Sequence, residues 1–210
     1  MSDIIQGSAE WHALRCGRVT ASRVADVVAK TKSGWGASRA NYAAELIAER
    51  LTGEPSERFT NAAMQWGTDH EPDARAAYEF FRDAAVVEIG FVDHPSIAMT
   101  GASPDGLVGE DGLVEIKCPN TATHLDTLLS QTVPAKYVTQ MLWQMACTGR
   151  KWCDFVSFDS RLPESMSMFV KRVERDDKRI SELETEVAAF LEEISAKIEQ
   201  LNSLYGMKGA

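Results

Sequence analysis

The sequence lacks a long apolar segment, a paired-cysteine motif and any excess of positive charge. None of its apolar runs approaches the roughly 18 residues that a membrane-spanning helix needs. The first six residues have neither the basic start nor the apolar stretch of a secretory signal. We therefore expect a cytoplasmic protein with no membrane partner. Its composition, 44% hydrophobic and 25% charged over 210 residues, is that of a globular protein with one sizeable core.

The cysteines and histidines do not form a compact ligand set. Cys16, Cys118, Cys147 and Cys153 are widely spaced, and none belongs to a C-x-x-C pair. This spacing argues against a disulfide scaffold and favours four reduced, mostly buried thiols over an iron–sulfur cluster. The four histidines are not grouped with the cysteines in a zinc-binding pattern.

The charge is unevenly distributed. The net charge of −9 argues against a generally basic surface that coats DNA. Residues 174–199, however, carry nine acids and four bases, so more than half of the negative excess belongs to one C-terminal segment. The distribution of charge matters more than its sum, and an enzyme that acts on nucleic acid is still compatible with the composition.

The order of predicted elements indicates one α/β (α+β) domain over residues 1–210, with a central mixed β-sheet flanked by helices. A helical part occupies about residues 8–82, a sheet region about 85–175 and a long C-terminal helix about 176–204. Apolar spacing, caps and turn residues predict helices over 8–14, 20–29, 38–52, 60–82, 121–129 and 134–147. Residues 31–36 are predicted to form a loop, and strands are predicted over 85–92, 97–100, 153–158 and 166–173, with a hairpin over 107–118.

The most informative segment is Ser103-Pro104-Asp105-Gly106, followed by Glu115-Ile116-Lys117. Asp105-Gly106 is a turn signal when taken alone, and Glu115 and Lys117 are equally compatible with the polar side of a half-exposed strand. A hairpin, however, brings Asp105 and Glu115 together on neighbouring strands. Two adjacent carboxylates repel each other and favour a bound cation. With a lysine beside them, they are the set that a magnesium-dependent phosphodiester hydrolase needs.

A third acid, Glu71, lies on the predicted helix 60–82, from which it could reach the same metal. The alternative is an ordinary solvated acid on an alanine-rich helix. Trp35 lies in the predicted loop with Lys32 and Arg39, so it could stack on DNA bases or wedge between them. An ordinary surface-loop position is an equally good interpretation of Trp35.

Five motifs in order resemble the phage lambda exonuclease group, the YqaJ-like viral recombinase family within the PD-(D/E)XK nuclease superfamily. They span about residues 8–150 and comprise Trp11-His12-Ala13-Leu14-Arg15 with Gly17 and Thr20-Ala21-Ser22, Trp66-Gly67 with Glu71 and Asp73-Ala74-Arg75, Ser103 to Leu107, Glu115 to Pro119, and Tyr137 with Gln140. The resemblance implies a PD-(D/E)XK nuclease core.

The resemblance also implies roles for single residues. Asp105, Glu115 and the backbone carbonyl of Ile116 would bind Mg²⁺, with Mn²⁺ as an alternative and two ions per site, and Glu71 would support the second ion. Lys117 would be the catalytic lysine. Arg15 and Ser22 would hold a terminal 5′-phosphate, and Ser103 and Gln140 would make further contacts near the site. Without the resemblance, the residues alone favour a surface charge for Arg15, a cap or local backbone hydrogen bond for Ser22 and a helix-surface amide for Gln140.

The function that follows is a metal-dependent 5′-to-3′ exodeoxyribonuclease on double-stranded DNA, which releases 5′-mononucleotides and leaves a 3′ single strand for recombination. The alternatives are a structure-selective DNA endonuclease on the same core and a DNA-end-binding recombination factor without turnover. The resemblance further implies a homotrimeric ring around DNA, a single-strand annealing protein as partner, and a phage or prophage gene expressed in a bacterial host.

Overall fold

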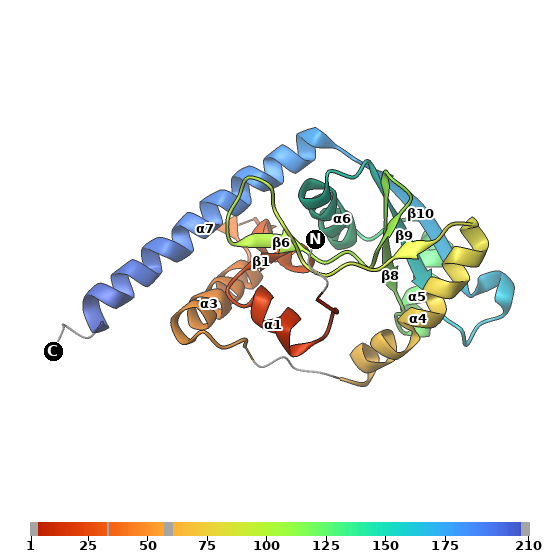
Figure 1. Cartoon of the computed structure of the whole chain (residues 1–210), viewed down its shortest axis with the longest axis horizontal. Coiled ribbons are helices and arrows are strands. Elements are labelled where there is room, and N and C mark those ends of the chain that lie inside the picture. Colours follow the sequence, from red (N-terminus) through yellow and green to blue (C-terminus); the bar gives the residue numbers. More distant parts are fainter. Residues whose placement is uncertain (1–3, 33, 57–60, 207–210) are drawn as a thin grey trace.

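A mixed five-stranded β-sheet lies between helices in this computed structural model, which describes residues 4–32, 34–56 and 61–206 (Figure 1). The strands follow the order β10-β9-β8-β7-β4. Only β8 and β9 run parallel, and the other neighbours are antiparallel. The bounds are β4 Val86–Val87, β7 Gly106–Val108, β8 Gly112–Lys117, β9 Trp152–Phe158 and β10 Met168–Glu174.

The two faces of the sheet are covered by different helices because side chains alternate along each strand. On one face, Val114, Ile116 and Val156 pack against Ala74 and Tyr78 of α4 (Ala62–Arg82). On the other face, a second apolar cluster joins the sheet to α6 (Ala135–Thr148), with Leu113, Phe155, Phe169, Met141, Leu142 and Met145 as its main members. Glu115 and Lys117 lie two and four residues after Leu113, so their side chains point to the same face of β8, which is the α6 side.

A second layer is built from the N-terminal segments and the C-terminal helix. β1 (Val19–Thr20) pairs in parallel with β6 (Thr100–Ala102), which pairs antiparallel with β5 (Val92–Asp93). α7 (Asp177–Tyr205) packs Val187, Phe190 and Ile194 against the apolar side of α3 (Ala37–Thr52). Figure 1 shows α7 as a long rod whose C-terminal turns extend away from the sheet. No helix within the described ranges is long and apolar enough to cross a bilayer.

The predicted fold class is confirmed: helices flank mixed sheets, and the C-terminal helix is long. The predicted hairpin is present as β7 and β8, and Gly53 ends α3 in the left-handed conformation at φ 74°. Asp176 caps α7 by accepting a hydrogen bond from the Arg179 N–H. The helices predicted over 8–14, 121–129 and 134–147 are α1 (Ala9–Arg15), α5 (Thr121–Ser130) and α6, each within one or two residues of the predicted bounds.

Several local predictions are wrong. The predicted helix over 20–29 is a 3₁₀ turn, η1 (Ala21–Arg23), followed by the single turn α2 (Val24–Val27). The predicted loop over 31–36 contains a short hairpin of β2 (Lys30–Thr31) and β3 (Gly34–Trp35). The predicted strand over 85–92 is divided between β4 and β5, which belong to different sheets, and the strand predicted over 97–100 begins only at Thr100.

The predicted starts of two helices also change. α3 begins at Ala37, one residue before the predicted start, and Gly36 is its N-cap. Thr60, the predicted start of the fourth helix, lies outside the described residues. α4 begins at Ala62, with the side chain of Asn61 accepting from the Met64 N–H. The remaining irregular turn, η2, spans Glu164–Met166.

Candidate active site

The β7–β8 hairpin places Asp105 beside Glu115. Gly106 pairs with Val114 in this antiparallel register. Asp105, one residue before Gly106, is therefore set opposite Glu115, one residue after Val114. A carboxylate oxygen of Asp105 accepts from the Ile116 N–H at 2.6 Å, which fixes the side chain against β8. Gly106 is required sterically, because a Cβ there would lie 2.1 Å from Val86 Cγ1. The close pairing of the two acids therefore follows from the sequence at the hairpin.

Glu115 is fully buried, and its carboxylate is held by two amides of α6. Gln140 Nε2 donates to Oε1 at 2.6 Å, and Gln144 Nε2 donates to Oε2 at 2.5 Å. Residues four apart lie on one face of a helix, so α6 can present both amides to the same carboxylate. Gln140 is thus buried beside Glu115 and is not a helix-surface amide. Gln144 is a further residue of the site that the sequence analysis missed, although its i+4 spacing from Gln140 is visible in the sequence.

Lys117 neutralises part of this buried charge. Its ammonium forms an ion pair with Glu115 Oε1, and its side chain is 28% exposed whereas that of Glu115 is 0% exposed. Although burial opposes the charge, the Glu115 and Asp105 carboxylates raise the pKa of Lys117 above its ordinary value. Burial and the charge of Glu115 raise the pKa of Asp105 well above its ordinary value. Lys117 therefore stays protonated without metal, whereas the ionised form of Asp105 is disfavoured unless a further cation binds.

Glu71 approaches the site from α4, on the other side of the sheet edge. Its carboxylate accepts from Arg75 at 2.8 Å, and Arg75 also pairs with Glu88 at 2.6 Å. Burial raises the pKa of Glu71, and the charges of Lys117 and Glu115 both act on it. Glu71 is thus half-buried and electrostatically coupled to the hairpin pair, in contrast to a fully solvated helix acid.

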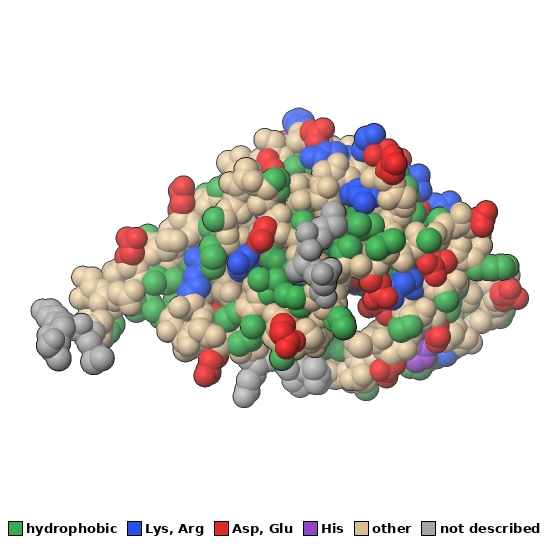
Figure 2. Space-filling view, in the orientation of Figure 1, with side chains coloured by type: hydrophobic (Ala, Val, Ile, Leu, Met, Phe, Trp, Pro, Cys, Tyr) green, Lys and Arg blue, Asp and Glu red, His purple; other side chains and the backbone are tan. Residues whose placement is uncertain are grey.

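A cavity of about 600 Å³ opens at this edge of the sheet and joins the site to the surface. Its wall includes Glu71, Ile116, Lys117 and Tyr137. The beginnings of three helices also line it. They contribute Ala63 and Met64 of α4, Asn120 and Thr123 at the start of α5, and Lys136 of α6. Helix N-termini carry partial positive charge and free N–H groups, so this rim favours anions. Figure 2 shows a hollow beside α4 with acidic and basic side chains at its edge.

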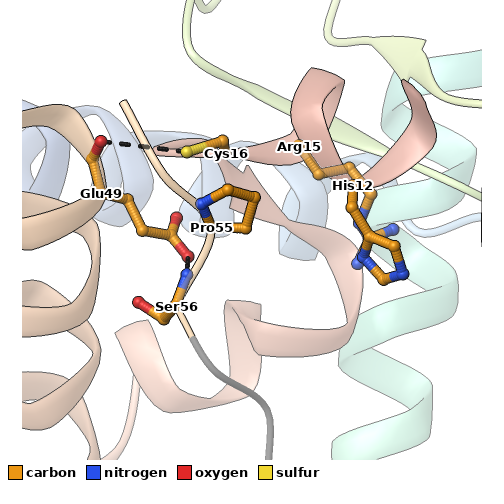
Figure 3. Close-up of a pocket in the computed structure, with 6 residues that line it drawn as sticks. All are labelled: His12, Arg15, Cys16, Glu49, Pro55 and Ser56. Atoms are coloured by element: carbon orange, nitrogen blue, oxygen red, sulfur yellow. Dashed lines mark hydrogen bonds between the residues drawn. The ribbon is translucent and has the colours of Figure 1, made fainter. Parts of the chain in front are cut away.

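A second cavity, of about 250 Å³, contains the predicted phosphate-binding residue Arg15 (Figure 3). His12 and Arg15 reach it from α1, and Glu49 faces them from α3. The Glu49 carboxylate accepts from the Gly17 N–H at 2.6 Å and the Ser56 N–H at 2.9 Å, which occupies both of its oxygens. Arg15 is 9% exposed, so it is not an ordinary surface charge.

Arg15 is connected to the hairpin through Ser103. Arg15 Nη1 donates to Ser103 Oγ at 3.2 Å, and Trp11 Nε1 donates to the same oxygen at 3.0 Å. The guanidinium also lies 3.9 Å from the centroid of the Trp11 ring. Because Ser103 is two residues before Asp105, these hydrogen bonds attach α1 to the segment that leads into the acid pair.

Two predicted residues lie apart from these contacts. Ser22 is exposed in η1, where its hydroxyl lies 3.4 Å from that of Thr20, and it lines neither cavity. Trp35 is 46% exposed and lines a groove between α3 and α7, with Arg39 4.1 Å and Lys30 4.6 Å from its ring centroid. The structure does not bring either residue to the acid pair.

The donor set fits a hard divalent cation. Asp105 and Glu115 offer carboxylate oxygens, and a bound cation would oppose both causes of the raised pKa of Asp105, which are burial and the charge of Glu115. Each carboxylate oxygen has two lone pairs, so the amide bonds to Glu115 leave acceptor capacity. Within the described ranges, no three His, Cys, Asp or Glu side chains are already gathered around one point as a metal site.

Residues 10–151 match the model of the YqaJ-like viral recombinase domain. The chain belongs to that family. The resemblance found in the motifs is thereby confirmed, and the matched region contains the acid pair, Lys117, both amides of α6 and Glu71.

Solved structures extend this relationship beyond the matched domain. An alkaline exonuclease from Laribacter hongkongensis is 57% identical, with a TM-score of 0.88 over 93% of this chain and 97% of the other, and its complex with dAMP matches equally well. A phage-related exonuclease from Haemophilus somnus shares the fold at 16% identity, with a TM-score of 0.73 over 90% of this chain and 99% of the other. A comparison with curated proteins finds no match.

Proposed function

We propose that this chain is a divalent-metal-dependent 5′-to-3′ exodeoxyribonuclease that releases mononucleotides from the ends of double-stranded DNA. Membership of the family and 57% identity to an alkaline exonuclease support a nuclease that acts on DNA. The observation that carries the proposal is the pairing of half-buried Asp105 with fully buried Glu115, next to Lys117, which lines an open cavity. The complex of that relative with dAMP supports a mononucleotide as product.

Asp105, Glu115, the Ile116 carbonyl and Glu71 would hold Mg²⁺, or Mn²⁺ as an alternative, with two ions per site. Bound there, such ions activate water and stabilise charge on the phosphate. Gln140 and Gln144 fix the orientation of the Glu115 carboxylate. The Lys117 side chain would orient the attacking water and stabilise the added negative charge at the phosphate.

The end of the DNA would be recognised by Arg15, with Ser103 and the α1 motif. A guanidinium can grip a terminal phosphate through two parallel hydrogen bonds. The hydrogen bond from Arg15 to Ser103 attaches the guanidinium to the hairpin. This supports a fixed distance between the bound 5′-phosphate and the phosphodiester bond that is cleaved. Ser22 would require movement of η1, or of the DNA, to share that phosphate. Trp35 could contact DNA only at the α3–α7 groove.

We also propose a homotrimeric ring around the DNA, which would make digestion processive and place the acidic C-terminal segment outside a less acidic channel. A single-strand annealing protein in the bacterial cytoplasm would take up the 3′ strand that remains. Sedimentation of the chain as a monomer alone would exclude the ring without affecting the nuclease assignment.

The decisive experiment compares three DNA substrates in Mg²⁺: linear duplex with a 5′-phosphate, the same duplex without it, and closed circular duplex. We expect mononucleotides from the first substrate, slower release from the second, none from the third, and no release in the presence of a chelator. Arg15→Ala should reduce the preference for the 5′-phosphate. Cutting of the circle would identify an endonuclease, and binding of ends without product in any metal would identify a non-catalytic factor.

A further inference from the structure

We propose that Lys136 binds a backbone phosphate of the DNA at the mouth of the catalytic cavity, an inference that rests on the proposed nuclease function. Lys136 is the second residue of α6 and is exposed. It lines the same cavity of about 600 Å³ as Glu71 and Lys117. It belongs to none of the motifs that predicted the catalytic residues.

The ring of Tyr137 connects the two lysines. The Lys136 ammonium lies 4.7 Å from the centroid of this ring, and that of Lys117 lies 5.6 Å from the same centroid. The two nitrogens are therefore at most about 10 Å apart. One strand of duplex DNA rises about 3.4 Å per nucleotide. Lys136 can thus reach a phosphate within about three nucleotides of the one that faces Lys117.

Tyr137 is itself held in place. Its ring stacks on Phe155 of β9, with centroids 5.4 Å apart and an interplanar angle of 26°. Phe155 is 1% exposed and belongs to the core on the α6 side of the sheet. A lysine on such a platform has its stem directed by a fixed aromatic face, while its ammonium remains at the surface.

The charge of Lys136 is available to a ligand. Lys30, Lys151 and Lys197 pair with carboxylates at 3.0, 3.0 and 2.6 Å. Lys136, by contrast, forms no ion pair with any residue that the structure describes, and its ammonium lies over the Tyr137 ring. The first turns of α4, α5 and α6 around it lower the cost of bringing a phosphate there. In a chain of net charge −9, an unpaired cation at this cavity favours a polyanionic ligand.

The test measures how the affinity of the full-length chain for duplex DNA depends on salt. Binding is monitored by fluorescence anisotropy, with a chelator present, over about 50 to 200 mM salt. Loss of one phosphate contact should reduce the magnitude of the slope of log K against log salt by about 0.9. We expect Lys136→Ala to show this reduction and to weaken binding roughly fivefold. In Mg²⁺ the weaker DNA binding of Lys136→Ala should appear as a higher KM, while kcat at saturating DNA is retained. Lys136→Arg keeps the charge and should keep the wild-type slope.

Lys178 provides the matched control. It is exposed in the first turn of α7, which follows β10 at the opposite end of the strands from Lys117. Lys178→Ala should keep the wild-type slope. A wild-type slope in Lys136→Ala, or an equal loss in Lys136→Arg, would overturn the inference. Absence of nucleotide release by the wild-type chain would instead refute the proposed function, while the binding measurement in chelator still decides the role of Lys136.

Discussion

Replacement of Lys117 by methionine separates its electrostatic role from its volume. The methionine keeps most of the side-chain bulk but removes the cation beside Asp105 and Glu115. The fully buried Glu115 carboxylate and the half-buried Asp105 carboxylate then lack their ammonium partner. We expect Lys117→Met to be less stable than the wild-type chain without metal, and to lose DNA hydrolysis with metal.

The magnitude follows from burial. Glu115 is fully buried and Lys117 is 28% exposed. Removing one partner of a buried ion pair costs about 3 to 5 kcal/mol, and the partial exposure of Lys117 favours the lower end. One kcal/mol shifts Tm by about 2–4 °C for a chain of this size, so Tm should fall by about 6–12 °C. Hydrolysis should fall by about 10² to 10³-fold, the usual cost of removing one positioned donor that stabilises transition-state charge.

The assay combines thermal unfolding, calorimetric Mg²⁺ titration and nucleotide release on 5′-phosphorylated duplex. Added Mg²⁺ should recover part of the lost stability, because a bound cation relieves the same repulsion. Lys151→Met serves as the control, since Lys151 is 69% exposed in its pair with Asp111 and an exposed pair contributes less than about 1 kcal/mol. Wild-type hydrolysis by Lys117→Met, or an unchanged Tm without metal, would refute this account of the site.

Three further predictions concern other parts of the structure. Gln144→Leu should weaken Mg²⁺ binding about 10- to 100-fold, because it removes one of the two amides that orient Glu115; calorimetry showing wild-type affinity would contradict this. Burial alone would raise the pKa of Asp159, but hydrogen bonds from Arg161 lower it to about 2. This carboxylate therefore contributes stability above its ordinary pKa of 3.8, and the contribution is lost as the pH falls toward 2, so the Tm of Asp159→Asn should depend less on pH over that range. Burial raises the pKa of Cys118 to about 12 and raises those of Cys147 and Cys153 above the ordinary range. Mass spectrometry after thiol labelling of the native chain at neutral pH should find reagent on Cys16 alone, and labelling of the other three before unfolding would count against the buried positions.

The sequence predicted the centre of the site because its determinants are local. A turn motif before Gly106 and a second turn at 109–112 set the hairpin, and the hairpin alone sets Asp105 opposite Glu115. Long helices were predicted for the same reason: α3 ends at a left-handed glycine, and α7 begins at an aspartate cap.

Features that depend on distant partners were missed. Val24, Val27 and Val28 have helical spacing, but the preceding Val19 and Thr20 pair with β6, about eighty residues later, which leaves only one turn for α2. Residues 86–92 are rich in β-branched and aromatic side chains, yet they are split between two sheets. Propensity does not specify the partner of a strand.

The network around Asp154 is a further example. Asp154 is fully buried on β9 and accepts hydrogen bonds from Tyr78 at 2.9 Å, Arg82 at 2.9 Å and Arg172 at 2.8 Å. Burial would raise its pKa, but these bonds lower it. Tyr78 and Arg82 belong to the helix that carries Glu71, so this network fixes the position of Glu71 relative to the sheet. The sequence separation of more than seventy residues conceals that connection.

The rim of the cavity is formed by the beginnings of three helices, and their peptide dipoles do not enter a count of ionisable side chains. A chain with an isoelectric point near 5.0 can therefore present an attractive local potential to a polyphosphate without a basic composition. Genome-wide screens that rank nucleic-acid enzymes by isoelectric point would pass over proteins of this type, whereas screens on backbone orientation around a cavity would retain them.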